Sequence, residues 1–272
     1  MTWRDNEPDV LIVVPTLGRR IGYLREALTS VVEQERRADI VVVTPPDAVE
    51  ARAVATEVRA TVINDPGGLS AAVNVGMAAA KPHHRFANWL GDDDVLPSGS
   101  LRSTADVLDR DPRASMAYGH CTYIDGEGRP LFVSRAGRLA PALLGWGPNL
   151  VPQPGMLFRL ADFFAVGGLD ESLRYSMDLD LLLRLKRHGR LVDSGSEVSM
   201  FRWHPESLTV SARRASLAEA ELVKRRYLPR SALRFSSLWE RPVRIATHAA
   251  AHRVAQLAAR AAASQPSSMN QP

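Results

Sequence analysis

The chain has 272 residues, of which 45% are hydrophobic and 24% are charged, the composition of a globular chain with room for one large domain and an appendage. Its formal net charge is +4, and its single cysteine, Cys121, excludes an intrachain disulfide and a cysteine-based zinc site, as is typical of a reducing cytoplasm. Residues 1–9 lack the pattern of a signal peptide, and no apolar run approaches the roughly 20 residues that a bilayer-spanning helix needs.

Short apolar runs alternate with helical patterns over the first hundred residues. Strands are predicted at residues 10–14, 40–43, 61–63 and 86–90, because each run is short, rich in apolar residues and bounded by turn residues. Helices are predicted between them, at residues 19–35, 48–59 and 69–80. This alternation predicts βαβ units and an α/β fold with a mostly parallel sheet flanked by helices.

The next hundred residues are less regular. A helix is predicted at 101–108, strands at 115–124, 131–134 and 156–159, and an extended segment at 191–203. Residues 140–154 are rich in Pro and Gly and are predicted to form a loop or a mobile lid. Leu181 to His188 form a strongly apolar helical pattern, for which Gly189 is the expected C-terminal cap.

The C-terminal part differs in charge from the rest. Residues 1–183 carry 18 basic and 24 acidic side chains, whereas residues 184–272 carry 16 basic and 6 acidic ones. Helices are predicted at 216–227 and 241–263, and the second is rich in alanine with a basic stripe. It is predicted either to lie on an anionic membrane surface or to be a solvated basic helix, and no motif favours nucleic acid.

Three consecutive aspartates, Asp92, Asp93 and Asp94, follow the predicted strand at 86–90. Three adjacent like charges repel one another, and the oxygen ligands that they offer are those that Mg2+ or Mn2+ prefers. Open α/β sheets bind ligands at the C-terminal ends of their strands, which is where these residues are expected. The alternative interpretation is a solvated acidic turn.

Two further segments are candidates for nucleotide binding. Pro15 and Thr16 end the first strand, and Gly67-Gly68 precede a helix that carries Asn74 one turn in. Each segment is also compatible with an ordinary strand end or helix start. Neither the glycine-rich dinucleotide fingerprint nor a P-loop occurs in the chain.

Candidate acid–base residues occur late in the chain. Asp178 and Asp180 lie near the start of the helix predicted at 181–188. Asp178 is interpreted either as a general base or as a helix cap, since the helix dipole favours a carboxylate at that position. His204, which follows Arg202 and Trp203, is interpreted as a metal ligand, a phosphate contact or a structural hydrogen-bonding residue.

Taken in order, these segments resemble the family 2 glycosyltransferases, an inverting group with the GT-A fold. The segments are VLIVVPTLGR (10–19), GGLSAAVNVGMAAA (67–80), LGDDDVLP (90–97), VGGLDESLRYSMDLDLLLRL (166–185) and HPES (204–207). The block at 166–185 is the most specific of them, because it is similar to the family's GGFDE…D-x-D-L-x-L-R pattern.

The resemblance implies a role for each matching residue. Asp178 would be the catalytic base that deprotonates the acceptor hydroxyl, and Asp94 and His204 would hold Mg2+ or Mn2+. The nucleotide sugar would be bound by the remaining candidates, which are Pro15, Thr16, Asp47, Asn74, Asp92, Asp93 and Arg202. The chain departs from the family at the turn after the second strand, where Thr44-Pro45-Pro46-Asp47 replaces the usual acidic turn, and at Val73, where Arg is frequent.

The resulting expectation is a GT-A domain at 1–211, a basic helical extension at 212–263 and a disordered tail at 264–272. The implied activity is metal-dependent transfer of a hexosyl or deoxyhexosyl group from a nucleotide-diphosphate donor to a glycan or lipid-linked acceptor. The expected location is the cytoplasm, with peripheral contact at the inner face of the membrane. The alternatives are a nucleotidyltransferase and a non-catalytic nucleotide-sugar-binding module on the same fold.

Overall fold

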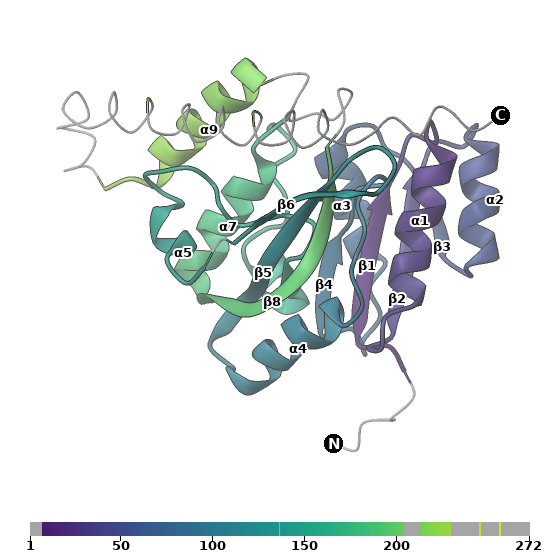
Figure 1. Ribbon diagram of the computed structural model, residues 1–272, viewed down its shortest axis with the longest axis horizontal. Coiled ribbons are helices and arrows are strands. Elements are labelled where there is room, and N and C mark those ends of the chain that lie inside the picture. The colour runs from purple at the N-terminus through teal and green to yellow at the C-terminus, as the bar shows by residue number, and fades with distance from the viewer. Residues whose placement is uncertain (1–6, 136, 204–212, 230–244, 246–255, 257–272) are drawn as a thin grey trace.

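The computed structural model describes residues 7–135, 137–203, 213–229, 245 and 256. Its centre is one sheet with helices on both faces (Figure 1). The strands of this sheet among the described residues are β1 (Val10–Pro15), β2 (Ala38–Thr44), β3 (Thr61–Asn64), β4 (Phe86–Trp89), β5 (Ala114–Ile124), β6 (Pro130–Ser134), β7 (Leu157–Arg159) and β8 (Arg190–Arg202).

The first four strands form the parallel half of the sheet that the sequence predicts. They lie in the order β3-β2-β1-β4, and Val13 of β1 pairs with Val41 of β2 and Trp89 of β4. Beyond β4 the sheet is mixed, because β7 runs antiparallel to both β4 and β5. One edge of β5 pairs in parallel with β8, and its other edge pairs with β7 near its start and with β6 near its end.

Two apolar layers sandwich this sheet. Because alternate strand residues point to opposite faces, Val10, Ile12 and Val14 pack on one side, while Leu11 and Val13 pack on the other. The first face is covered by α1 (Ile21–Val32), α2 (Val49–Glu57) and α4 (Ser100–Arg110). The second core contains residues of α3 (Leu69–Ala78), α5 (Ala140–Leu143), α6 (Leu160–Ala165), α7 (Met177–His188) and α9 (Arg213–Tyr227).

The structure corrects several predicted boundaries. Helix α7 begins at Met177, before the apolar run at 181, because the acidic residues Asp178 and Asp180 in its first turn favour the positive end of the helix dipole. Gly189 follows α7 as predicted, but with an extended backbone (φ −157°). Glycine is needed there for packing, because a Cβ would lie 2.1 Å from Ser115 Oγ. Helix α5 lies within the predicted loop, and α6 was not predicted.

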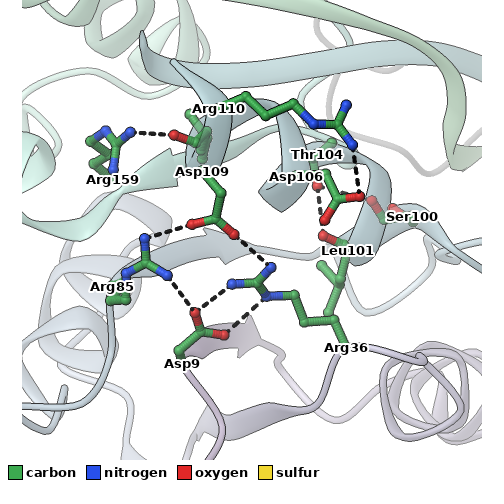
Figure 2. Close-up of polar contacts among 11 residues, drawn as sticks. Asp9, Arg36, Arg85, Ser100, Leu101, Thr104, Asp106, Asp109, Arg110 and Arg159 are labelled. Carbon is green, nitrogen blue, oxygen red and sulfur yellow. Dashed lines mark hydrogen bonds and ion pairs between the residues drawn. The ribbon is translucent and has the colours of Figure 1, made fainter. Parts of the chain in front are cut away.

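A network of ion pairs joins the starts of two strands to two helices (Figure 2). Arg36, after α1, binds Asp9 through Nε at 3.0 Å and Asp109 of α4 through Nη1 at 2.9 Å. Arg85, just before β4, reaches the same two carboxylates at 3.3 and 2.6 Å. These contacts fix the N-terminal ends of β1 and β4. The candidate site residues Thr16 and Asp92 lie at the opposite, C-terminal ends of these strands.

Helix α9 belongs to the packed body of the protein. Its residue Val223 is fully buried in the core beneath the sheet, and α9 lies beside α7. The helix predicted at 241–263 falls outside the described residues except for 245 and 256, as does the whole tail at 264–272. Within the part of the chain that the structure describes, the helices are too short or too polar to cross a bilayer.

Candidate active site

The C-terminal ends of β1 and β4 bring the first two candidate segments together. These strands are parallel neighbours, so Thr16 after β1 and Asp92 after β4 emerge at the same edge of the sheet. The hydroxyl of Thr16 donates a hydrogen bond to Asp92 Oδ2 at 2.5 Å and accepts one from the Gly18 backbone at 3.0 Å. Arg20 Nη2 lies 3.5 Å from Asp92 Oδ1 and 3.3 Å from Asp93 Oδ2.

Asp94 is the most deeply buried of the three aspartates. Its side chain is 4% exposed, and its Oδ1 accepts the backbone N–H of Arg202 at 3.1 Å. Burial, followed by the charge of Asp93, raises the pKa of the Asp94 carboxyl well above its usual range. Gly91 permits this arrangement, because a Cβ there would lie 2.8 Å from Asp94 Oδ2 and 2.9 Å from Asp93 Oδ1. The turn therefore gathers carboxylate oxygens in excess of nearby positive charge, which is the donor set that a hard divalent cation requires.

Arg202 is held inside the protein. It is 1% exposed; its Nε donates to the Asp93 carbonyl at 2.9 Å and its Nη2 forms an ion pair with Glu26 of α1. Nη1 donates to the carbonyl oxygens of residues 125 and 126. These contacts hold the aspartate turn in place. The guanidinium would have to give up some of them in order to contact a nucleotide sugar directly.

The structure gives fewer contacts for the other residues that were predicted to bind the nucleotide sugar or the metal. Asp47 is exposed in the loop after β2, and His204 lies outside the described residues. Pro15 is the last residue of β1 and pairs with Val43 of β2. Its position places it at the same edge of the sheet as Thr16.

Asn74 joins two of the sequence motifs directly. Its Nδ2 donates to the Leu169 carbonyl and to Glu171 Oε1, each at 3.0 Å, and its Oδ1 accepts the Leu169 N–H at 2.9 Å. A Cβ on Gly168, whose φ is +70°, would lie 2.9 Å from Asn74 Oδ1. In this structure Asn74 thus fixes the 167–171 turn to α3, and the predicted contact with a nucleotide sugar stays a prediction.

The candidate base Asp178 is the second residue of α7 and is partly buried. Burial raises the pKa of its carboxyl to about 6; backbone N–H groups of residues 178 and 179 oppose this rise, and the charge of Glu219 adds to it. Asn149 Nδ2 donates to Asp178 Oδ2 at 3.2 Å. A carboxylate with this pKa is mostly ionised at neutral pH. Its pKa also lies near the operating pH, as efficient general base catalysis requires.

One short segment links Asp178 to β4, the strand that precedes the aspartates. Asn149 contacts Asp178, and four residues later Gln153 Nε2 donates to the carbonyl of Trp89, the last residue of β4, at 2.7 Å. Val151 between them is buried in the same core as Met177. Segment 149–153 therefore spans from the base to the end of β4, and it forms part of the loop predicted at 140–154.

Three polar residues that contact or act on the candidate residues were not among the predicted site residues. Arg20 contacts Asp92 and Asp93, Asn149 contacts Asp178, and Glu219 acts on Asp178 electrostatically. Arg20 lies only a few residues after β1, so its place in the sequence could have marked it as a site residue. Asn149 and Glu219 are 29 and 41 residues from Asp178, in a loop and in a separate helix, so no local pattern marks them.

Asp39, His83 and His84 form a second group that could hold a metal ion, with ligand atoms within 4.8 Å of one another. It lies at the start of β2 and just before β4, the opposite edge of the sheet from Asp92. His84 Nδ1 accepts the Lys81 backbone N–H at 2.9 Å, so the neutral ring carries its proton on Nε2, 3.2 Å from Asp39 Oδ2. Lys81 Nζ lies 2.7 Å from the same oxygen. As arranged, the group is an ion-pair network, and metal binding would require both Lys81 contacts to change.

Comparison with known proteins gives a family and a set of similar folds. The family model described as "Glycosyl transferase family 2" matches residues 11–161, which is more than half of the chain. No curated protein matches the chain. Among solved structures, Staphylococcus aureus TarS 1–349 in complex with UDP-GlcNAc superposes with a TM-score of 0.60 and 17% identity, over 75% of this chain and 61% of that one.

Two further TarS structures from S. aureus are similar. TarS 1–349 gives a TM-score of 0.55 at 18% identity over 78% of this chain and 65% of that one. Another TarS crystal structure gives 0.55 at 18% identity, over 78% and 39% of the two chains. The chain thus spans less than two thirds of each of these three TarS chains, and at such identities the likeness concerns the fold.

Proposed function

The chain belongs to glycosyl transferase family 2, and from that premise we propose that it is an inverting, metal-dependent glycosyltransferase. It moves a hexosyl or deoxyhexosyl group from a nucleotide-diphosphate sugar to a hydroxyl of a glycan or lipid-linked acceptor. The observation that carries the proposal is the arrangement around segment 149–153. This segment joins Asp178, a carboxylate with a raised pKa, to the end of β4, where Thr16 meets the aspartates.

The donor side follows from the carboxylate turn. Asp94, with His204 as the second candidate ligand, would hold Mg2+ or Mn2+, and Asp92 and Asp93 would lie beside the nucleotide sugar. Such a cation neutralises the charge that develops on a diphosphate leaving group. The protein itself fixes the turn, since Thr16 holds Asp92 and the backbone of Arg202 holds Asp94.

The acceptor side follows from Asp178. Its carboxylate takes the proton of the acceptor hydroxyl as the hydroxyl oxygen bonds to the anomeric carbon and the bond from that carbon to the diphosphate breaks. Attack opposite the leaving group inverts the anomeric carbon, and no covalent enzyme intermediate forms. With a pKa of about 6, most Asp178 side chains are ionised at pH 7 and can accept this proton.

UDP-GlcNAc is the first donor to test, because one of the similar TarS structures is a complex with it. The assay compares Asp178→Asn with the wild type, and uses Asp106→Asn on α4, which covers the other face of the sheet, as the matched control. Asp178→Asn should keep its affinity for the donor and lose about 10²–10⁴-fold in turnover, the usual effect of removing a general base. Unchanged turnover in this variant would exclude Asp178 from the mechanism.

The basic C-terminal part supports a second element of the proposal, peripheral contact with an anionic membrane on the cytoplasmic side. Residues 184–272 carry 16 basic and 6 acidic side chains, and anionic lipids attract such a segment. Co-sedimentation with vesicles of phosphatidylcholine and phosphatidylserine should be stronger for the whole chain than for a chain that ends at Arg230. Equal partitioning of the two would contradict this membrane role. The division into residues 1–211, 212–263 and 264–272 also stays a proposal.

A further inference from the structure

A carboxylate from α9 binds the backbone immediately before the candidate base. Glu219 Oε1 accepts the N–H of Arg174 at 3.0 Å, and Oε2 accepts those of Tyr175 at 2.6 Å and Ser176 at 2.7 Å. Helix α7 begins at the next residue, and Asp178 is its second residue. The N-cap residue Ser176 makes no side-chain cap of its own. Glu219 therefore supplies, from another helix, the anion that the N-terminus of α7 favours.

Other contacts fix α9 in this position against α7. Tyr227 donates its hydroxyl to Asp180 Oδ1 at 2.6 Å, and Ser176 Oγ donates to the Ser216 carbonyl at 3.4 Å. Lys224 Nζ donates to the carbonyl of Gly147, two residues before Asn149, at 2.5 Å. Helix α9 thus contacts both the first turn of α7 and the loop that holds the Asp178 side chain.

We propose that Glu219 is a positioning residue for the reaction, which holds residues 174–176 so that Asp178 is presented to the acceptor hydroxyl. The inference rests on the proposed function of Asp178 and deepens it. Glu219 is 58 residues beyond the end of the family match at residue 161, so the positioning comes from a part of the chain outside that match.

The carboxylate also acts on Asp178 through its charge. Among the residues that the structure describes, the charged groups near this end of α7 include Glu219 and Lys224 from α9, Arg174 before α7 and the ion pair of Asp180 with Arg184, while Asn149 from the loop is neutral. Burial is the main cause of the raised pKa of Asp178, and the charge of Glu219 adds to it. Removing the charge of Glu219 should therefore lower the pKa of Asp178, which gives a readout that is separate from folding.

Two variants of α9 separate positioning from general damage. Glu219→Gln keeps the shape of the side chain but removes its charge and replaces one acceptor oxygen with an NH₂ donor. Glu221→Gln makes the same chemical change two residues further along the helix, away from the 174–176 amides, and is the matched control. Circular dichroism and the melting temperature establish that each full-length variant is folded.

Three measurements test the inference, and two of them need no substrate. In Glu219→Gln, carbon NMR titration should show a lower pKa for Asp178, and hydrogen exchange should show faster exchange of the 174–176 amides. With UDP-GlcNAc as the probe, turnover should fall by up to about 10²-fold with little change in donor KM, since small displacements of a catalytic group cost about that much. Glu221→Gln should match the wild type in all three.

An unchanged Asp178 pKa together with unchanged 174–176 exchange in folded Glu219→Gln would overturn the inference. If Glu219→Gln does not fold, Glu219→Asp is the second variant, because it keeps the charge but shortens the reach. It should show faster exchange of these amides, and wild-type exchange would overturn the inference. The two proposals fail differently: if Asp178→Asn loses turnover while Glu219→Gln keeps it, only positioning fails. If Asp178→Asn keeps full turnover, the proposed function of Asp178 fails.

Discussion

Replacing Asp178 with Asn should stabilise the protein while it inactivates it. The pKa of this carboxyl is raised from 3.8 to about 6 by burial, so the folded protein binds the proton more tightly than the unfolded chain does. The free energy of unfolding of the wild type should therefore fall as the pH rises from about 4 to about 6, and then stay lower. This difference in pKa corresponds to about 3 kcal/mol.

Asparagine resembles the protonated acid, and its carbonyl oxygen can still accept the hydrogen bond from Asn149. At pH 8 the Asp178→Asn variant should thus exceed the wild type by up to about 3 kcal/mol in the free energy of unfolding, or by about 6 °C in melting temperature. At pH 4 the two should be nearly equal, because few Asp178 side chains are then ionised in the folded wild type.

The assay is urea denaturation of both proteins at pH 4, 6 and 8, with Asp106→Asn as the control for loss of one surface carboxylate. A variant that is no more stable than the wild type at pH 8 would refute the reasoning. So would a gain of equal size at all three pH values, because that gain could not come from ionisation of Asp178.

Three other predictions concern the turn, the core and the metal. Arg202→Met should cost about 1–3 kcal/mol of unfolding free energy in urea, because it leaves buried carbonyl oxygens without their donor; an unchanged free energy of unfolding would contradict the contacts described. Gly76→Ala should cost about 1–3 kcal/mol, because its Cβ would lie 2.4 Å from Val13 Cγ1, whereas Gly22→Ala on α1, with open space around it, should be neutral or stabilising. Equal melting temperatures for these two variants would argue against the packing of α3 on β1. Chelation with EDTA should abolish transfer and Mn2+ or Mg2+ should restore it, while full activity in chelator would rule out the metal role.

The parallel half of the fold could be predicted because its signals are local. The run Val10 to Val14 is rich in β-branched residues and wholly apolar, so its burial in the sheet follows from composition alone. The meeting of Thr16 with Asp92 also follows, since parallel neighbouring strands end at the same edge. The antiparallel part of the sheet could not be predicted in this way, because it depends on pairings between strands that are distant in the sequence. Helix α6 was missed because it is too short to show a helical period.

The contacts around the site were less predictable, because they join distant parts of the chain. Asn74 and Arg202 could be recognised as motif residues. Their hydrogen bonds to the carbonyl oxygens of Leu169 and Asp93, 95 and 109 residues away, are nevertheless set by tertiary packing. Glu219 lies in a charged helix that shows no motif, and only the packing of α9 against α7 brings it to the 174–176 amides. Sequence patterns locate residue types at strand and helix ends, whereas the partners of those residues depend on how the elements pack.

The central claim is that Asp178 and the aspartate turn act together to transfer a sugar with inversion. The most direct measurement is proton NMR of a reaction with UDP-GlcNAc, Mn2+ and a panel of glycan and lipid-linked acceptors. The account predicts release of UDP and a product whose new glycosidic bond has the β configuration, starting from the α-linked donor. Release of pyrophosphate or an α-linked product would contradict it, as would binding of the donor without transfer to any acceptor.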